Sequence, residues 1–183
     1  MMNDVMLDLE TMGTGTLAPI VSIGAVKFDL KTGATGEELY YNISLKDSMN
    51  RGMNPDARTI EWWLEQSIDA RKHLFDPEPV ELEHALGKFY DFAKGCYVWG
   101  NGATFDNRLI TEAFRLIGMK TSWKYSQDMD VRTLVRLGEM NGIDYKSVVM
   151  DGISHCAIDD AKFQIAYCHY VYDKLFINKG DGI

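Results

Sequence analysis

Four acidic residues and one histidine lie along the chain in an order that suits metal-dependent chemistry. Asp8 and Glu10 are two residues apart in an apolar segment, so on a β-strand both carboxylates point to one face while Leu7 and Leu9 point to the other. Carboxylates are costly to place beside a core, and their mutual repulsion adds to that cost. A divalent cation removes both costs, because magnesium and manganese prefer oxygen ligands. The pair therefore predicts a metal site.

Two later segments supply the rest of the set. Asp106 ends the segment NGATFD, and His155 and Asp160 lie five residues apart in HCAIDD. Each fragment alone has an ordinary explanation, such as a strand end in solvent, a helix cap or surface chemistry. Their co-occurrence at the start, middle and end of one chain favours a single site. The imidazole adds a candidate general base, because imidazole titrates near neutrality.

At these residues the sequence resembles the DnaQ-like 3′–5′ exonucleases, in the histidine branch of the DEDD superfamily. DLETMG matches the first motif, WGNGATFDN the second and HCAIDDA the third. The tyrosine branch places a tyrosine four residues before the last aspartate, and this chain has Cys156 there. The segment RTIEWWLEQ also resembles the smaller phage-type and bacterial exonucleases of the superfamily.

The resemblance implies a metal-dependent 3′–5′ exonuclease that releases nucleoside 5′-monophosphates from the 3′ ends of single-stranded nucleic acid, with DNA favoured over RNA. Asp8, Glu10 and Asp160 would hold the first of two divalent cations, Mg²⁺ or Mn²⁺. Asp8 would bridge to the second cation, and Asp106 would contribute directly or through water. His155 would take the proton from the attacking water.

The expected substrate contacts follow the first motif and flank the second: Thr11, Met12, Gly13, Trp99, Asn101 and Phe105. Met12 stands where many relatives have Thr or Ser, so it would pack against a base rather than donate a hydrogen bond. Trp99 and Phe105 could stack on bases, or they could belong to the core, which is the stronger interpretation for Trp99 on its apolar strand. Asn101 would contact substrate or shape the site.

Composition narrows the class of protein. The 183 residues carry a net charge of −8, which argues against general electrostatic binding to nucleic acid and predicts contact with only a few terminal nucleotides. We expect a single exonuclease domain over residues 1–183, in the cytoplasm and without membrane contact, because the start of the chain has no secretory pattern and no apolar run is long enough to span a bilayer. Cys96, Cys156 and Cys168 lack metal-binding spacing and predict free thiols.

The hydrophobic pattern predicts an α/β protein with a mixed sheet flanked by helices, in which three antiparallel strands open the chain. The resemblance implies that this sheet has the ribonuclease H-like fold, in which parallel strands follow the antiparallel opening. We expect strands over residues 4–10, 20–30, 38–45 and 96–100. We expect helices within residues 53–66, 79–93, 106–117, 130–137 and 157–175. Ile60, Trp63 and Leu64 would form the apolar face of the first helix, and the tail, residues 178–183, would be frayed.

Several alternatives remain open at this point. The same scaffold could be a 3′–5′ exoribonuclease or an oligoribonuclease-like enzyme for short substrates, or a catalytically inactive nucleic-acid-interaction module. The complete set of acids and histidine weighs against the inactive module. The contact to the 2′-hydroxyl that separates RNA from DNA cannot be assigned. Relatives include dimers, so a homodimer is a further expectation. His73, His84 and His169 lie outside the motifs and predict surface or helix-face positions.

Overall fold

Five strands form one mixed sheet in the computed structural model, which describes residues 2–177. The strands are β1 (Asp4–Thr11), β2 (Ile20–Phe28), β3 (Thr35–Asn42), β4 (Tyr97–Gly100) and β5 (Asp128–Asp130). Their order in the sheet is β3-β2-β1-β4-β5. The strands β1, β2 and β3 pair antiparallel, whereas β4 pairs parallel with β1 and β5 pairs parallel with β4. The expected mixed sheet with an antiparallel opening is confirmed.

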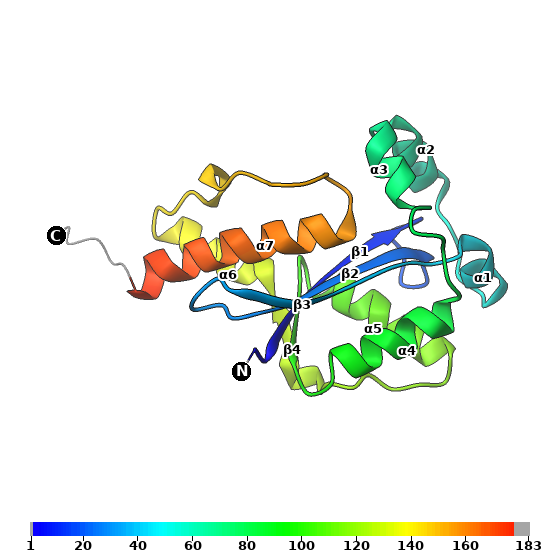
Figure 1. Cartoon of the computed structure of the whole chain (residues 1–183), viewed down its shortest axis with the longest axis horizontal. Coiled ribbons are helices and arrows are strands. Elements are labelled where there is room, and N and C mark those ends of the chain that lie inside the picture. The colour runs from blue at the N-terminus through cyan, green and yellow to red at the C-terminus, as the bar shows by residue number, and fades with distance from the viewer. Residues whose placement is uncertain (1, 178–183) are drawn as a thin grey trace.

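Helices cover both faces of this sheet (Figure 1). They are α1 (Leu45–Asn50), α2 (Ala57–Glu65), α3 (Ile68–His73), α4 (Leu82–Phe92), α5 (Asp106–Leu116), α6 (Val131–Met140) and α7 (Ala157–Tyr172). Leu7 and Leu9 pack in one cluster with residues of α4 and α5, whereas Met6 packs in a second cluster with residues of α6 and α7. The alternation of β1 therefore turns Asp8 and Glu10 toward the α7 side of the sheet.

A glycine lets α7 begin directly on the sheet. Gly24 lies opposite Asp8 in the antiparallel pair, and a Cβ at Gly24 would overlap the backbone of Ala157, the first residue of α7. Only a residue without a side chain permits this approach. The N-terminal turn of α7, which carries Asp160, is thereby fixed above the acids of β1.

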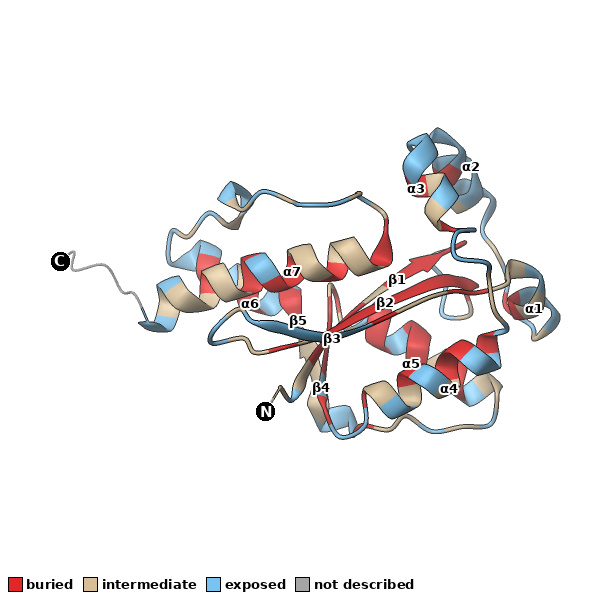
Figure 2. Cartoon of the chain, in the orientation of Figure 1, coloured by how far each residue is buried: buried red, intermediate tan, exposed pale blue. Residues whose placement is uncertain are grey.

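The helices α2 and α3 extend beyond the end of the sheet and are mostly exposed (Figure 2). Trp63 is buried, as expected, but Ile60 is 38% exposed and Leu64 is 65% exposed. The expected apolar face of this helix is therefore wrong for Ile60 and Leu64. The reason is that α2 lies over a small satellite cluster instead of the sheet, so little apolar surface faces it.

Other boundaries differ from the expectation in detail. The third strand begins and ends three residues earlier than expected, and the short elements α1, α3 and β5 were not expected. The last helix ends at Tyr172 and continues as a π-helical turn, Asp173–Ile177. The predicted fraying of residues 178–183 lies outside the described residues. Within residues 2–177, no helix is both long and apolar enough to cross a membrane. The three cysteines are buried free thiols, as expected.

Candidate active site

The residues of the first two motifs meet where the parallel strands end. Glu10 lies near the end of β1, and Asp106 begins α5 after the short loop that follows β4. The carboxyl ends of neighbouring parallel strands form one edge of a sheet, and ligands of α/β proteins bind in the crevice there. Both side chains are largely buried, with 9% of Glu10 and 3% of Asp106 exposed. Gly100, the last residue of β4, allows α5 to begin close to this strand, because a Cβ at Gly100 would overlap the side chains of Asp106 and Asn107.

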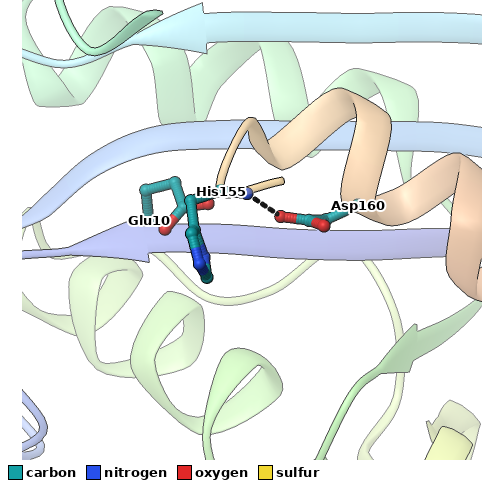
Figure 3. Close-up of side chains that lie close together, drawn as sticks. All are labelled: Glu10, His155 and Asp160. Carbon is teal, nitrogen blue, oxygen red and sulfur yellow. Dashed lines mark hydrogen bonds between the residues drawn. The ribbon is translucent and has the colours of Figure 1, made fainter. Parts of the chain in front are cut away.

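The residues of the third motif lie at the same edge of the sheet. His155 precedes α7 in a left-handed backbone conformation, with φ of +65°. Its backbone N–H donates to Oδ2 of Asp160 at 2.8 Å, which ties the loop to the first turn of α7 (Figure 3). Non-glycine residues adopt this conformation rarely, and it is often found at functional sites. The turn aims the imidazole at the acids of β1.

Glu10, His155 and Asp160 form a group that could hold a metal ion. One ligand atom of each lies within 4.8 Å of the others (Figure 3). Carboxylate oxygens suit magnesium and manganese, whereas imidazole suits later transition metals such as zinc. The geometry therefore permits two roles for His155, as a base beside a cation held by carboxylates or as a ligand itself.

Burial raises the pKa of every acid in the cluster, and repulsion from the other acids adds to this effect at Asp8 and Glu10. Burial raises the pKa of Asp106 to about 7, although hydrogen bonding from the backbone of Leu9 opposes the change. Burial, and then repulsion from Asp106 and Asp160, raises the pKa of Asp8 well above its usual value. The pKa of Glu10 is raised well above its usual value by burial and then by its three acidic neighbours. A bound cation would reverse these shifts, because it favours the charged form of each carboxyl.

A cavity of about 410 Å³ connects the five motif residues, and we name it the acid cavity. It is lined by Asp8, Leu9, Glu10, Asn101, Phe105, Asp106, Arg132, Tyr145, His155, Asp160, Phe163, Gln164 and Tyr167. All five predicted acid and histidine positions are therefore brought together. The sequence interpretation missed the contributions of α6, of the segment at Tyr145 and of the middle of α7.

Gln164 is the overlooked residue closest to the acids. Its Nε2 donates to Oδ1 of Asp8 at 2.7 Å, and the side chain is only 3% exposed. This hydrogen bond favours the charged form of Asp8 and lowers its pKa, against the larger effect of burial. The spacing could have revealed the residue, because Gln164 lies four residues after Asp160 and shares its helix face.

The expected substrate residues separate into two groups. Thr11, Gly13 and Phe105 line a second hollow of about 380 Å³, which we name the tryptophan hollow. It is lined by Leu9, Glu10, Thr11, Gly13, Thr14, Arg58, Thr59, Trp62, Trp63 and Phe105. It adjoins the acid cavity, since Leu9, Glu10 and Phe105 line both. Asn101 lines the acid cavity itself.

Met12 and Trp99 lie elsewhere. Met12 is buried in the satellite cluster with Val21 and Trp63, so its side chain is not presented to a base. Trp99 is buried against Phe28, and its Nε1 donates to Oδ1 of Asp4 at 2.8 Å. The core interpretation of Trp99 fits this position, and the substrate interpretation of both side chains does not.

Two tryptophans of α2 contact the histidine. The ring of His155 meets Trp62 edge-on with centroids 4.8 Å apart, and it meets Trp63 at 6.3 Å. Trp63 is fixed by a 2.9 Å hydrogen bond from its Nε1 to the carbonyl of Thr11. The segment RTIEWWLEQ therefore bears directly on the position of the imidazole.

The remaining histidines are remote from this cavity. The ring of His84 packs edge-on against Tyr41, and Nδ1 of His169 lies 3.1 Å from the carbonyl oxygen of Leu30. His73 lies at the end of α3, where its carbonyl accepts from Tyr40. None of the three lines the acid cavity.

Comparison with known proteins places the chain in a family. Residues 3–172 match the model of the 3′–5′ exoribonuclease Rv2179c-like domain. The chain belongs to this family. A curated relative, the exodeoxyribonuclease of Enterobacteria phage T4, is 25% identical over 202 residues, which cover 92% of this chain and 88% of the phage protein.

Solved structures show the same fold at low sequence identity. The nuclease domain of 3′hExo, a DEDDh family member bound to rAMP, superposes with a TM-score of 0.60 and 13% identity, covering 93% of this chain and 92% of that one. E. coli exonuclease I in complex with a dT13 oligonucleotide gives a TM-score of 0.64 and 14% identity, covering 97% of this chain but 44% of that one. This member of the Rv2179c-like family is thus a DnaQ-like 3′–5′ exonuclease with the expected ribonuclease H-like fold, and its acid cluster suits the divalent metals that such nucleases use.

Proposed function

We propose that this exonuclease removes nucleotides one at a time from the 3′ end of single-stranded nucleic acid, with DNA favoured over RNA, and releases nucleoside 5′-monophosphates. The observation that carries the proposal is the convergence of Asp8, Glu10, Asp106, His155 and Asp160 on one cavity. The preference for DNA rests on the phage exodeoxyribonuclease, which resembles this chain along nearly its whole length.

The carboxylates have the role of holding Mg²⁺ or Mn²⁺. Asp8, Glu10 and Asp160 would hold one cation, and Asp8 with Asp106 a second. Bound there, the cations supply Lewis-acid stabilisation of the charge that develops on the attacking and leaving oxygens. Gln164 keeps Asp8 oriented through its 2.7 Å hydrogen bond.

His155 takes the proton from the attacking water. Its φ of +65° and the 2.8 Å hydrogen bond from its backbone to Asp160 hold the residue at the mouth of the acid cavity. Trp62 supports one edge of the ring. The ring is otherwise partly exposed, so the proton can pass on to solvent.

The tryptophan hollow receives the terminal nucleoside. Its lining is largely apolar and includes the ring of Phe105, which suits stacking on a base irrespective of its identity. Thr11 and Gly13 line the same hollow, and the hydroxyl of Thr11 is already turned to the carbonyl of Gly13 at 2.7 Å. Backbone groups there would contact the sugar.

The deciding experiment uses 5′-labelled DNA and RNA oligomers of matched sequence with Mg²⁺ or Mn²⁺. We expect a ladder that shortens from the 3′ end, nucleoside 5′-monophosphate as product, and faster digestion of DNA. A terminal 3′-phosphate should block digestion and a 5′ block should not. Early release of the 5′ label would contradict the polarity. Asp8→Ala and Asp160→Ala should abolish cleavage at saturating Mg²⁺ with the fold retained.

The second candidate is a 3′–5′ exoribonuclease or an oligoribonuclease-like enzyme, which is favoured by the description of the matching family. Faster digestion of the RNA series, or digestion restricted to the shortest oligomers, would select it. Loss of all cleavage would select the inactive interaction module. The single domain, the cytoplasmic location and the homodimer stay expectations, and sedimentation velocity tests the last of them.

A further inference from the structure

A third hollow adjoins the acid cavity and shares no lining residue with the tryptophan hollow. It encloses about 460 Å³ and shares Asn101, Arg132, Tyr145 and Tyr167 with the acid cavity. Val135, Arg136 and Glu139 of α6 complete its lining. We name it the arginine hollow. The acid cavity therefore adjoins two different hollows: one at the end of β1, which is largely apolar although Arg58 is part of its lining, and one lined by two arginines of α6.

The two arginines give this hollow a charge unlike that of the chain as a whole. The net charge is −8, yet Arg132 and Arg136 lie four residues apart and share one face of α6. Among residues 2–177, Arg132 makes no salt bridge within 4.0 Å. Its charge still reaches the acids, because it lowers the pKa of Asp106 against the larger effect of burial.

Backbone contacts fix Arg132 beside the loop of the second motif. Asp130 caps α6 by accepting from the N–H of Thr133 at 2.7 Å, and its other oxygen accepts from the N–H of Ala103 at 2.6 Å. Gly102, with φ of +112°, then leaves room for the guanidinium, since a Cβ there would lie 3.1 Å from Cζ of Arg132. The guanidinium of Arg132 is thus positioned where the acid cavity meets the arginine hollow before any ligand binds.

Arg136 is held less firmly. Its Nη1 lies 3.3 Å from Oε2 of Glu139, in a pair whose side chains are 69% and 43% exposed. Exposed pairs of this kind are weak, so a phosphate with two or three oxygens can take the guanidinium from Glu139. Glu139 itself opposes an anion in the hollow, and its removal should strengthen binding.

A strand whose scissile phosphodiester lies at the acids must leave the cavity on both sides. The apolar side suits a sugar and base, whereas the arginine side suits phosphate oxygens. We propose that the arginine hollow binds the phosphate immediately 5′ to the scissile one, either as a phosphodiester or as a 5′-terminal phosphomonoester. The tilted rings of Tyr145 and Tyr167, 5.3 Å apart, line both cavities, where they would contact the penultimate nucleoside. This inference rests on the proposed function, which supplies the direction of the strand.

Three short substrates isolate the contribution of that phosphate. A dinucleoside monophosphate carries only the scissile phosphate, its 5′-phosphorylated form adds one phosphate, and a trinucleoside diphosphate adds the same phosphate within a diester. Each is used in the deoxy and the ribo series. For the wild-type enzyme, kcat/KM should rise roughly tenfold on addition of either phosphate, the usual worth of charge-assisted hydrogen bonds. The gain should shrink as salt increases.

Arg136→Gln is the diagnostic variant because Arg132 also acts on Asp106. In Arg136→Gln most of the gain should vanish, while kcat/KM for the unphosphorylated dinucleotide stays at the wild-type level. Arg115→Gln is the matched control, since Arg115 is as exposed as Arg136 and pairs with Glu112 three residues before it on α5, and it should keep the full gain. Glu139→Gln should enlarge the gain.

The two hypotheses fail in different ways. Wild-type enzyme that cleaves all three substrates equally, or Arg136→Gln that retains the full gain, would overturn the phosphate site and leave the exonuclease intact. If none of the substrates is cleaved, the proposed function fails, and calorimetry with the same three compounds still decides the binding site. Tighter binding of the phosphorylated dinucleotide to wild-type than to Arg136→Gln supports it, and equal binding overturns it.

Discussion

Removing the charge of Asp106 should flatten the dependence of stability on pH in the metal-free protein. Burial raises the pKa of Asp106 from 3.8 to about 7, so the folded state holds a proton at pH values where the unfolded chain has lost it. The contribution of Asp106 to the free energy of unfolding is therefore most favourable below about pH 4. It becomes less favourable as pH rises toward 7, because the folded state must then lose the proton from a buried carboxyl. The difference corresponds to about 4 kcal/mol, a large part of the stability of a small domain.

The assay is urea unfolding in EDTA at intervals from pH 4.5 to pH 8. The free energy of unfolding of the wild-type should fall across this window, since the raised pKa values of Asp8 and Glu10 act in the same direction. In Asp106→Asn the free energy of unfolding should decrease much less over the same pH range, so the variant should be more stable than the wild-type at pH 8. Saturating Mg²⁺ should restore wild-type stability there, because the cation binds only the folded site. Glu78→Gln, which removes an exposed carboxyl, is the control.

A wild-type protein whose metal-free stability is constant or rises between pH 4.5 and pH 8 would refute this reasoning. So would an Asp106→Asn variant that declines as steeply as the wild-type. Either result would mean that water or a partner stabilises the charged carboxylates in the metal-free protein. Their repulsion would then not destabilise the folded state.

Three further predictions concern the residues around the acids. His155→Ala should lower turnover by roughly two to four orders of magnitude, and Mn²⁺ titration that rescued it fully would make His155 a ligand. Trp62→Ala should lower kcat/KM about tenfold with little loss of stability, because the side chain is 40% exposed and supports the imidazole; Trp62→Phe should retain most activity. Gly24→Ala should lower the free energy of unfolding by about 1–3 kcal/mol, measured by thermal unfolding, because the added Cβ overlaps the backbone of Ala157. It should also reduce activity, because it displaces α7. Unchanged stability would show that α7 can move without cost.

The sequence could predict the members of the candidate site because each motif carries its residue types at fixed local spacing. The alternation of a strand placed Asp8 and Glu10 on one face, and the co-occurrence of the three segments, with their resemblance to the exonuclease motifs, added Asp106, His155 and Asp160. The contact of Trp62 with His155 could not be predicted, since it joins segments more than ninety residues apart through packing of α2. Gln164 lay within reach of a four-residue helical spacing and was missed.

Errors in the fold have similar causes. The strand β5 has only three residues, two of them aspartates, so no apolar alternation marks it. Its two aspartates instead accept hydrogen bonds from neighbouring segments. Asp128 accepts from Asn107 and Trp123, and Asp130 caps α6. The helix α2 has an amphipathic sequence, but only Trp63 among its residues is buried, because the helix lies past the end of the sheet. Burial depends on where an element lies, and periodicity alone does not report that.

The order of the strands accounts for the order of the three hollows. The tryptophan hollow lies beside the end of β1, where Thr11 ends the strand. Asp106, which begins the helix after β4, lines the acid cavity but not the arginine hollow, whereas Val135, Arg136 and Glu139 of α6, the helix after β5, line only the arginine hollow of these two. Since β1, β4 and β5 are parallel neighbours in that order, the proposed sites for the terminal nucleoside, for cleavage and for the 5′ phosphate would follow one another along one edge of the sheet. The 3′-to-5′ direction of the bound strand would then follow from sheet topology, which makes the arginine hollow a consequence of the fold as well as of its side chains.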